Sequence, residues 1–105
     1  MELAVFWTQF AENKLEDIFH YYKYEVNIDV ARRLVNGIVE KTIDQENHPY
    51  KGQKEELLKD RPEDFRYLVY KSYKIIYRIN EEKQRIEIAN VFDCRRNPTK
   101  MNEVE

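Results

Sequence analysis

The alternation of hydrophobic and polar positions is clearest in Phe65–Asp93, where it predicts three consecutive strands. The first two, Phe65–Tyr70 and Tyr73–Ile79, are aromatic and β-branched runs on either side of a short turn at Lys71-Ser72. The third strand, Arg85–Phe92, follows a polar loop. We expect the rest of the chain to pack around this meander.

Upstream of the meander, the pattern predicts a strand and then two helices. The short apolar run Leu3–Trp7 predicts a strand that is buried on both faces, and Thr8 after it offers an N-cap hydroxyl. Two stretches with hydrophobic residues at helical spacing follow. Asn27 and Asp29 interrupt the first and supply the cap of the second. Their hydrophobic positions are Ala11, Leu15, Ile18, Phe19 and Tyr22, then Ala31, Leu34, Val35, Ile38 and Val39. So short a link predicts an antiparallel helical hairpin.

The segment between the helices and the meander is expected to be mostly loop. Residues 45–64 are polar and are interrupted by Pro49, Gly52 and Pro62, while Leu57-Leu58 should hold the loop to the core. The predicted order is therefore β-α-α-β-β-β, an α+β fold with a small, mainly antiparallel sheet and a helical hairpin on one face. The length of 105 residues suits one domain, which we assign to residues 1–98, with a short tail at 99–105.

The length of the first meander turn decides which side chains share a face. With a two-residue turn, Arg66 lies opposite Tyr77, and Lys74 points to the other face of the sheet. A different loop length would move Arg66 to the side of Lys74. The sequence leaves both arrangements open.

The formal charge of −2 hides an asymmetry along the chain. Residues 1–48 carry five basic and nine acidic side chains, whereas residues 49–100 carry thirteen basic and nine acidic ones. The charged residues of the first two meander strands and their turn are all basic, with tyrosines between them. Such a surface can bind phosphate or RNA, but a sheet whose outer face simply happens to be basic is the commoner case. Lys51 and Lys54 are either part of a solvated loop or a rim beside this sheet.

Several classes of protein are disfavoured. The single Cys94 cannot form an internal disulfide, and the chain has neither the features of a signal peptide nor a run of apolar residues long enough to span a membrane. We therefore expect a cytoplasmic protein. Neither histidine has a partner at metal-ligand spacing, and glycine-rich phosphate loops and GxSxG or HExxH motifs do not occur. We expect no metal and no cofactor.

Basic and aromatic side chains still allow one metal-independent chemistry. Lysine or arginine can hold a scissile phosphate while a ribose 2′-OH attacks it, and tyrosine can stack on an unpaired base. Such a nuclease also needs a general acid and a general base. The available candidates are Lys74, Arg66, Tyr70, Asp93 and Arg95. The same surface could instead dock an acidic protein partner.

Four short motifs occur in a recognisable order. They are VFWT before the first helix, HPYKGQKEELLKD in the middle, SYKIIYRI in the meander and IEIANVFDCRRNP at its end. Their order and spacing, from Leu3 to Pro98, resemble the RelE/ParE superfamily of toxins from type II toxin–antitoxin (plasmid stabilisation) systems. The resemblance implies a small sheet with a helical hairpin on one face, and a cognate antitoxin that wraps the toxin.

The resemblance also implies roles for individual residues. Members resembling RelE cut ribosome-bound mRNA with basic residues of the central strands, and Lys74, Arg66 and Arg95 or Arg96 match these by position. Side chains that would bind RNA or a partner are Tyr70, Lys71, Arg78, Lys51 and Lys54. Members resembling ParE instead poison DNA gyrase without catalysis. We expect mRNA cleavage, with two alternatives: gyrase inhibition, because no tyrosine or histidine follows Arg96, or a degenerate member that only binds its antitoxin.

Overall fold

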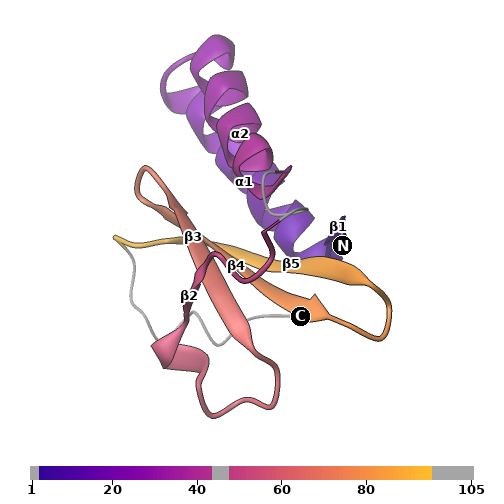
Figure 1. Cartoon of the computed structure of the whole chain (residues 1–105). Coiled ribbons are helices and arrows are strands. Elements are labelled where there is room, and N and C mark those ends of the chain that lie inside the picture. Colours follow the sequence, from indigo (N-terminus) through magenta and orange to yellow (C-terminus); the bar gives the residue numbers. More distant parts are fainter. Residues whose placement is uncertain (1–2, 44–47, 96–105) are drawn as a thin grey trace.

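The computed structural model describes residues 3–43 and 48–95, so Arg96 and the expected tail at 99–105 lie outside the described residues. Within these ranges the chain forms a five-stranded sheet and a pair of α-helices (Figure 1). The elements are β1 (Ala4–Trp7), α1 (Gln9–Glu25), α2 (Ile28–Ile43), β2 (Gln53–Lys54), the 3-10 helix η2 (Glu56–Leu58), β3 (Phe65–Tyr70), β4 (Tyr73–Asn80) and β5 (Arg85–Asp93).

The strands lie in the order β1-β5-β4-β3-β2, and the predicted α+β fold is confirmed. Strand β1 runs parallel to β5, while every other neighbouring pair is antiparallel. Strand β2 was not predicted. It consists of two exposed polar residues that pair with Tyr67 and Arg66 at the edge of the sheet, so no hydrophobic alternation marks it in the sequence.

Of the two arrangements that the sequence leaves open, the structure has the one with a two-residue turn between β3 and β4. Tyr70 lies opposite Tyr73, and Arg66 lies opposite Tyr77. The turn closes with Lys71 at φ 55°, a left-handed conformation. This register directs Arg66 and Lys74 to opposite faces of the sheet, because side chains alternate along a strand.

Both helices begin at the predicted caps. The Thr8 hydroxyl accepts a hydrogen bond from the Ala11 N–H (3.2 Å) and donates one to the carbonyl of Ile88 (2.8 Å), so it caps α1 and ties the chain to β5. The Asn27 side chain accepts from the Val30 N–H at 2.9 Å and starts α2. Capping in this way satisfies backbone donors that the first helical turn leaves open.

The main core lies between the hairpin and one face of the sheet. Its buried members include Leu3, Ala11, Leu34, Ile38, Leu68, Tyr73, Ile75, Tyr77, Ile86, Ile88 and Val91. The tyrosines at 73 and 77 therefore belong to the core rather than to an exposed basic face. On the other face, a smaller cluster of Leu58, Phe65, Ile76, Ala89 and Phe92 lies beneath η2.

Two local predictions about burial are wrong. Strand β1 is not buried on both faces, because it is an edge strand and the helices cover only one side; Phe6 is 41% exposed. In η2, Leu58 is buried, but Leu57 points to solvent. One turn of 3-10 helix directs only one of two adjacent leucines inward.

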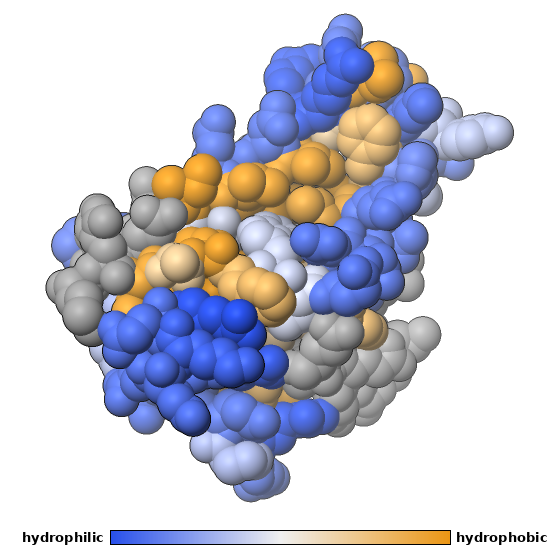
Figure 2. Space-filling model, turned by 90° about the vertical axis from the view of Figure 1, so that its right-hand side faces the viewer, coloured by the Kyte–Doolittle hydropathy of each residue, from blue (hydrophilic) through white to orange (hydrophobic). Residues whose placement is uncertain are grey.

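The helical hairpin extends beyond the sheet, as Figure 1 shows. A band of hydrophobic surface runs along it on the side seen in Figure 2, bordered by hydrophilic side chains. Around the link between the helices, Tyr21, Tyr24, Val26 and Ile28 are exposed. The hairpin therefore buries only part of its hydrophobic surface within this chain.

Candidate functional site

Lys74 is engaged by an acidic residue on the face of the sheet away from the hairpin. Its ammonium nitrogen lies 2.9 Å from a carboxylate oxygen of Glu55, and it also lies 4.2 Å from the centre of the Tyr67 ring. The Glu55 side chain is 3% exposed, and its second oxygen accepts from the Leu57 N–H at 3.2 Å. The lysine of the SYKIIYRI motif is thus neutralised from within the chain.

Arg78 is on the same face and is also paired. Its Nε donates to Glu87 at 2.7 Å, and Arg85 donates to the other oxygen of that carboxylate at the same distance. Burial disfavours the charged form of Glu87, but the hydrogen bonds from the two guanidinium groups outweigh it, so its pKa is lowered. Arg78 therefore serves an internal ion-pair network.

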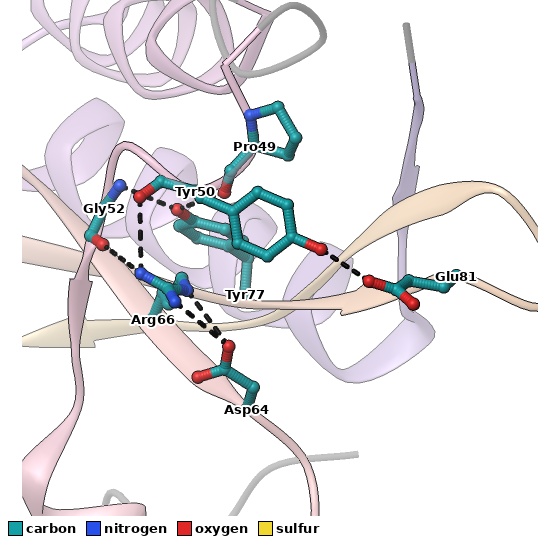
Figure 3. Close-up of polar contacts among 7 residues, drawn as sticks. All are labelled: Pro49, Tyr50, Gly52, Asp64, Arg66, Tyr77 and Glu81. Carbon is teal, nitrogen blue, oxygen red and sulfur yellow. Dashed lines mark hydrogen bonds and ion pairs between the residues drawn. The ribbon is translucent and has the colours of Figure 1, made fainter. Parts of the chain in front are cut away.

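Arg66 anchors the loop before β2 on the hairpin side of the sheet (Figure 3). It donates to the carbonyl oxygens of Tyr50 (3.3 Å) and Gly52 (3.0 Å), and its Nη2 lies 3.2 Å from Asp64. Below the same loop, the Tyr77 hydroxyl donates to the carbonyl of Pro49 at 2.9 Å and accepts from the Gly52 N–H at 3.0 Å. Arg66 and Tyr77 thus fix the segment 49–52.

Arg95 follows β5 and contacts the first helix. It forms a two-pronged pair with Asp93, with both donor–acceptor distances 2.9 Å, and donates to the Tyr22 hydroxyl at 3.5 Å. A hydrogen bond with Tyr73, and then one with Arg95, lower the pKa of Tyr22. Burial and the hydrogen bond with Tyr22 raise the pKa of Tyr73.

A groove of about 280 Å³ opens beside this cluster. We call it the hairpin groove. The residues that line it are Tyr22, Val30, Arg33, Leu34, Lys71, Ser72 and Tyr73. They come from both helices and from the β3–β4 turn. The groove combines apolar walls with two cations, and Arg95 adds a third through its contact with Tyr22.

The remaining candidates lie apart from one another. Tyr70 packs against α2, where a Cβ on Gly37 would overlap its ring and hydroxyl, and Lys71 lies 5.8 Å from the Tyr70 ring centre. Lys51 and Lys54 are exposed in the loop and in β2. The predicted set of Lys74, Arg66 and Arg95 therefore does not converge on one point.

Sequence reasoning missed the acidic partners of these cations. Glu55 could have been suspected as the N-cap of a short helix in KEELL, and Glu87 as the lone charge in the alternating IEIA run. Gly37, inside a helix pattern, was a sign of close packing. Among the described residues, no group of histidine, cysteine, aspartate or glutamate side chains could hold a metal ion, and no helix could span a membrane.

Comparison with known proteins identifies the family. Residues 5–98 match the sequence model of the ParE toxin of the type II toxin–antitoxin system parDE. The chain belongs to this family. A solved structure described as the chromosomal ParDE toxin–antitoxin system of P. aeruginosa has the same fold, with a TM-score of 0.72 and 19% identity over 88% of this chain and 96% of the other. No curated protein matches the chain.

The match confirms the predicted RelE/ParE superfamily and the type II toxin class. It also implies an antitoxin partner. The narrower prediction of mRNA cleavage is not confirmed. Membership of the ParE family favours the alternative, a ParE-like toxin that inhibits gyrase without catalysis.

Proposed function

We propose that this ParE-family toxin arrests growth by binding and inhibiting DNA gyrase in the cytoplasm, without cleaving RNA. The observation that carries the proposal is the separation of Arg66 and Lys74 by the sheet. Arg66 holds two loop carbonyls, and Lys74 pairs with a buried carboxylate. A ribonuclease would need both cations on one scissile phosphate.

The geometry also disfavours RNA binding through the other cations. Arg78 shares Glu87 with Arg85, and Arg95 is bound to Asp93. An RNA phosphate would have to compete with carboxylates that are already held in place by the fold. Inhibition by docking onto a target protein requires no such competition.

The hairpin groove is the surface that we assign to the antitoxin. Its apolar residues Val30 and Leu34 would accept hydrophobic side chains, and Arg33 and Lys71 at its rim favour acidic ones. An acidic amphipathic segment of the antitoxin satisfies both requirements.

The test is induction of the chain alone in a bacterial host, with three readouts: growth, primer extension on abundant mRNAs, and supercoiling by purified gyrase with the purified toxin. We expect growth arrest, unchanged mRNA 5′ ends and loss of supercoiling. New translation-dependent 5′ ends with normal supercoiling would overturn the proposal.

A variant that lacks the Lys74–Glu55 ion pair tests separately whether Lys74 is needed for growth arrest. Lys74→Met combined with Glu55→Gln removes both members of the buried pair, so no unpaired charge remains. We expect this variant to arrest growth as the natural chain does. Loss of arrest in a variant that still folds and still binds antitoxin would restore Lys74 to a catalytic role.

A further inference from the structure

One side of α2 is left open to solvent by the described part of the chain. It carries Ile28, Arg32, Asn36, Glu40 and Ile43, all of which are exposed, and 51% of Ile43 is accessible. Successive members are three or four residues apart, so they lie on one side of the helix, different from the side that packs into the core. We call these five residues the α2 outer face.

The α2 outer face has a self-complementary order of side chains. From either end an isoleucine comes first and a charged residue second, and Asn36 lies in the middle. The two charges have opposite signs. Within residues 3–43 and 48–95, neither Arg32 nor Glu40 has an ion-pair partner. Such a face matches a second copy of itself that runs in the opposite direction.

We propose that two copies of this chain associate through the α2 outer face, with their α2 helices antiparallel about a twofold axis near Asn36. Arg32 of each copy then lies opposite Glu40 of the other, because both are four positions from Asn36. Ile28 lies opposite Ile43 of the other copy, with an offset of one residue, about 1.5 Å along the helix. A single register therefore forms all of these pairs.

Charge complementarity favours a second copy over the acidic segment that we assign to the antitoxin. An acidic segment on this face would meet Glu40 as well as Arg32, whereas the hairpin groove presents Arg33 and Lys71. In the dimer both charges are paired, and the isoleucines are removed from water. The lining of the hairpin groove includes none of the five residues, so the inference does not depend on the proposed function.

The size of the α2 outer face predicts a weak dimer. The helix has 16 residues and is therefore about 24 Å long. A contact that is one helix wide over this length is smaller than the roughly 800 Å² per partner of a standard interface. The hairpin extends beyond the sheet (Figure 1), so two hairpins can meet side by side without contact between the sheets.

Sedimentation equilibrium of the purified chain tests the proposal. We expect the average mass to rise from 12.9 kDa toward twice that value as the concentration reaches the high-micromolar range. Arg32→Glu should weaken association at least about tenfold, because it places acidic residues opposite each other. Arg33→Glu, the matched control, makes the same charge change outside the α2 outer face and should alter the Kd less than about threefold.

A mixture of two variants tests the pairing directly. Glu40→Arg alone should also associate poorly, because it places two arginines opposite each other. An equimolar mixture of Glu40→Arg with Arg32→Glu restores opposite charges at both contacts, and it should form heterodimers at least about tenfold more tightly than either variant forms homodimers.

Three results would overturn the inference. The first is a natural chain that stays monomeric, including the case in which Arg32→Glu weakens antitoxin binding as much as Arg33→Glu does, since the antitoxin would then cover this face. The second is a dimer that the two arginine variants weaken equally. The third is a mixture that associates no better than its components.

A cysteine variant covers the case in which the charge variants do not fold. In a Cys94→Ser background, Asn36→Cys places two thiols beside the twofold axis, so mild oxidation should join the two copies by a disulfide. Asn13→Cys, at an exposed position of α1, is the control and should cross-link at least about tenfold more slowly. Equal cross-linking of the two variants would contradict the proposed axis.

Discussion

The hydroxyl of Tyr77 accepts a 3.0 Å hydrogen bond from the backbone N–H of Gly52, a residue 25 positions earlier in the chain. The same hydroxyl donates to the carbonyl of Pro49. Its ring lies so close to Gly52 that a Cβ there would overlap the hydroxyl. The glycine of the HPYKG motif is therefore explained by a tyrosine of the central strand, which needs the space that a missing side chain leaves.

The first prediction concerns this hydroxyl. Tyr77→Phe removes one donor and one acceptor from a buried position and leaves two backbone groups without their partner. We expect the free energy of unfolding to fall by about 1–3 kcal/mol in urea denaturation. Tyr67→Phe is the control, because its hydroxyl bonds only to the exposed Gln53 side chain, and it should cost less than about 1 kcal/mol. Equal losses would contradict the anchoring role.

The second prediction concerns Gly37. Replacing a helical glycine with alanine normally stabilises a helix by about 1 kcal/mol, but here the new methyl group would meet Tyr70. We expect Gly37→Ala to lower stability in the natural chain and to raise it by about 1 kcal/mol when Tyr70→Ala is already present. Additive effects in this double-mutant cycle would mean that the ring does not constrain the helix.

The third prediction concerns acid stability. The pKa of Glu87 is lower in the folded state than in the unfolded chain, where it is about 4.3. Its contribution to stability is therefore present above that unfolded value and is lost as the pH falls through the folded value. We expect Glu87→Gln to lower the free energy of unfolding by about 2–4 kcal/mol at pH 7, with a smaller difference from the natural chain at pH 3. Glu82→Gln, in the exposed β4–β5 loop, should change the free energy of unfolding at pH 7 by less than about 0.5 kcal/mol.

The fourth prediction concerns the hairpin groove. Arg33→Glu reverses a charge at its rim, so it should weaken binding of the cognate antitoxin about tenfold and flatten the salt dependence of association. Arg32→Glu makes the same change one position away, outside the groove lining, and should change affinity less than threefold. Calorimetric titration of both variants at two salt concentrations distinguishes a loss of affinity at the groove from a general effect of the charge change.

Most of the fold could be predicted because hydrophobic periodicity determines it. The meander boundaries differ from the structure by at most one residue, and Thr8 and Asn27 cap the helices as expected. Strand β2 could not be predicted, because it is held by hydrogen bonds of its backbone to β3 rather than by buried side chains of its own. The burial of β1 depends on which elements pack against it, and the hydrophobic pattern of residues 3–7 does not contain that information.

The candidate site was harder to predict than the fold. The sequence identified the cations but not their partners, because Glu55 and Lys74 are 19 positions apart and meet only after β2 joins the sheet. The alternation of β3 and β4 showed that Arg66 and Lys74 could be separated, yet the choice depended on a turn length that the residues alone did not settle. The partners of side chains that meet across distant segments can be identified only from the folded structure.

The pairing of β1 with β5 has a consequence for the synthesis of the protein. The Thr8 hydroxyl reaches the carbonyl of Ile88 across 80 positions of sequence, and the parallel ladder joins residues 4–7 to residues 85–88. Strand β1 therefore has no partner strand until residues 85–88 have been translated. A nascent chain at this stage exposes the hydrophobic side chains of β1, and its sheet cannot close. The sheet of this toxin should thus close only after residues 85–88 have left the ribosome.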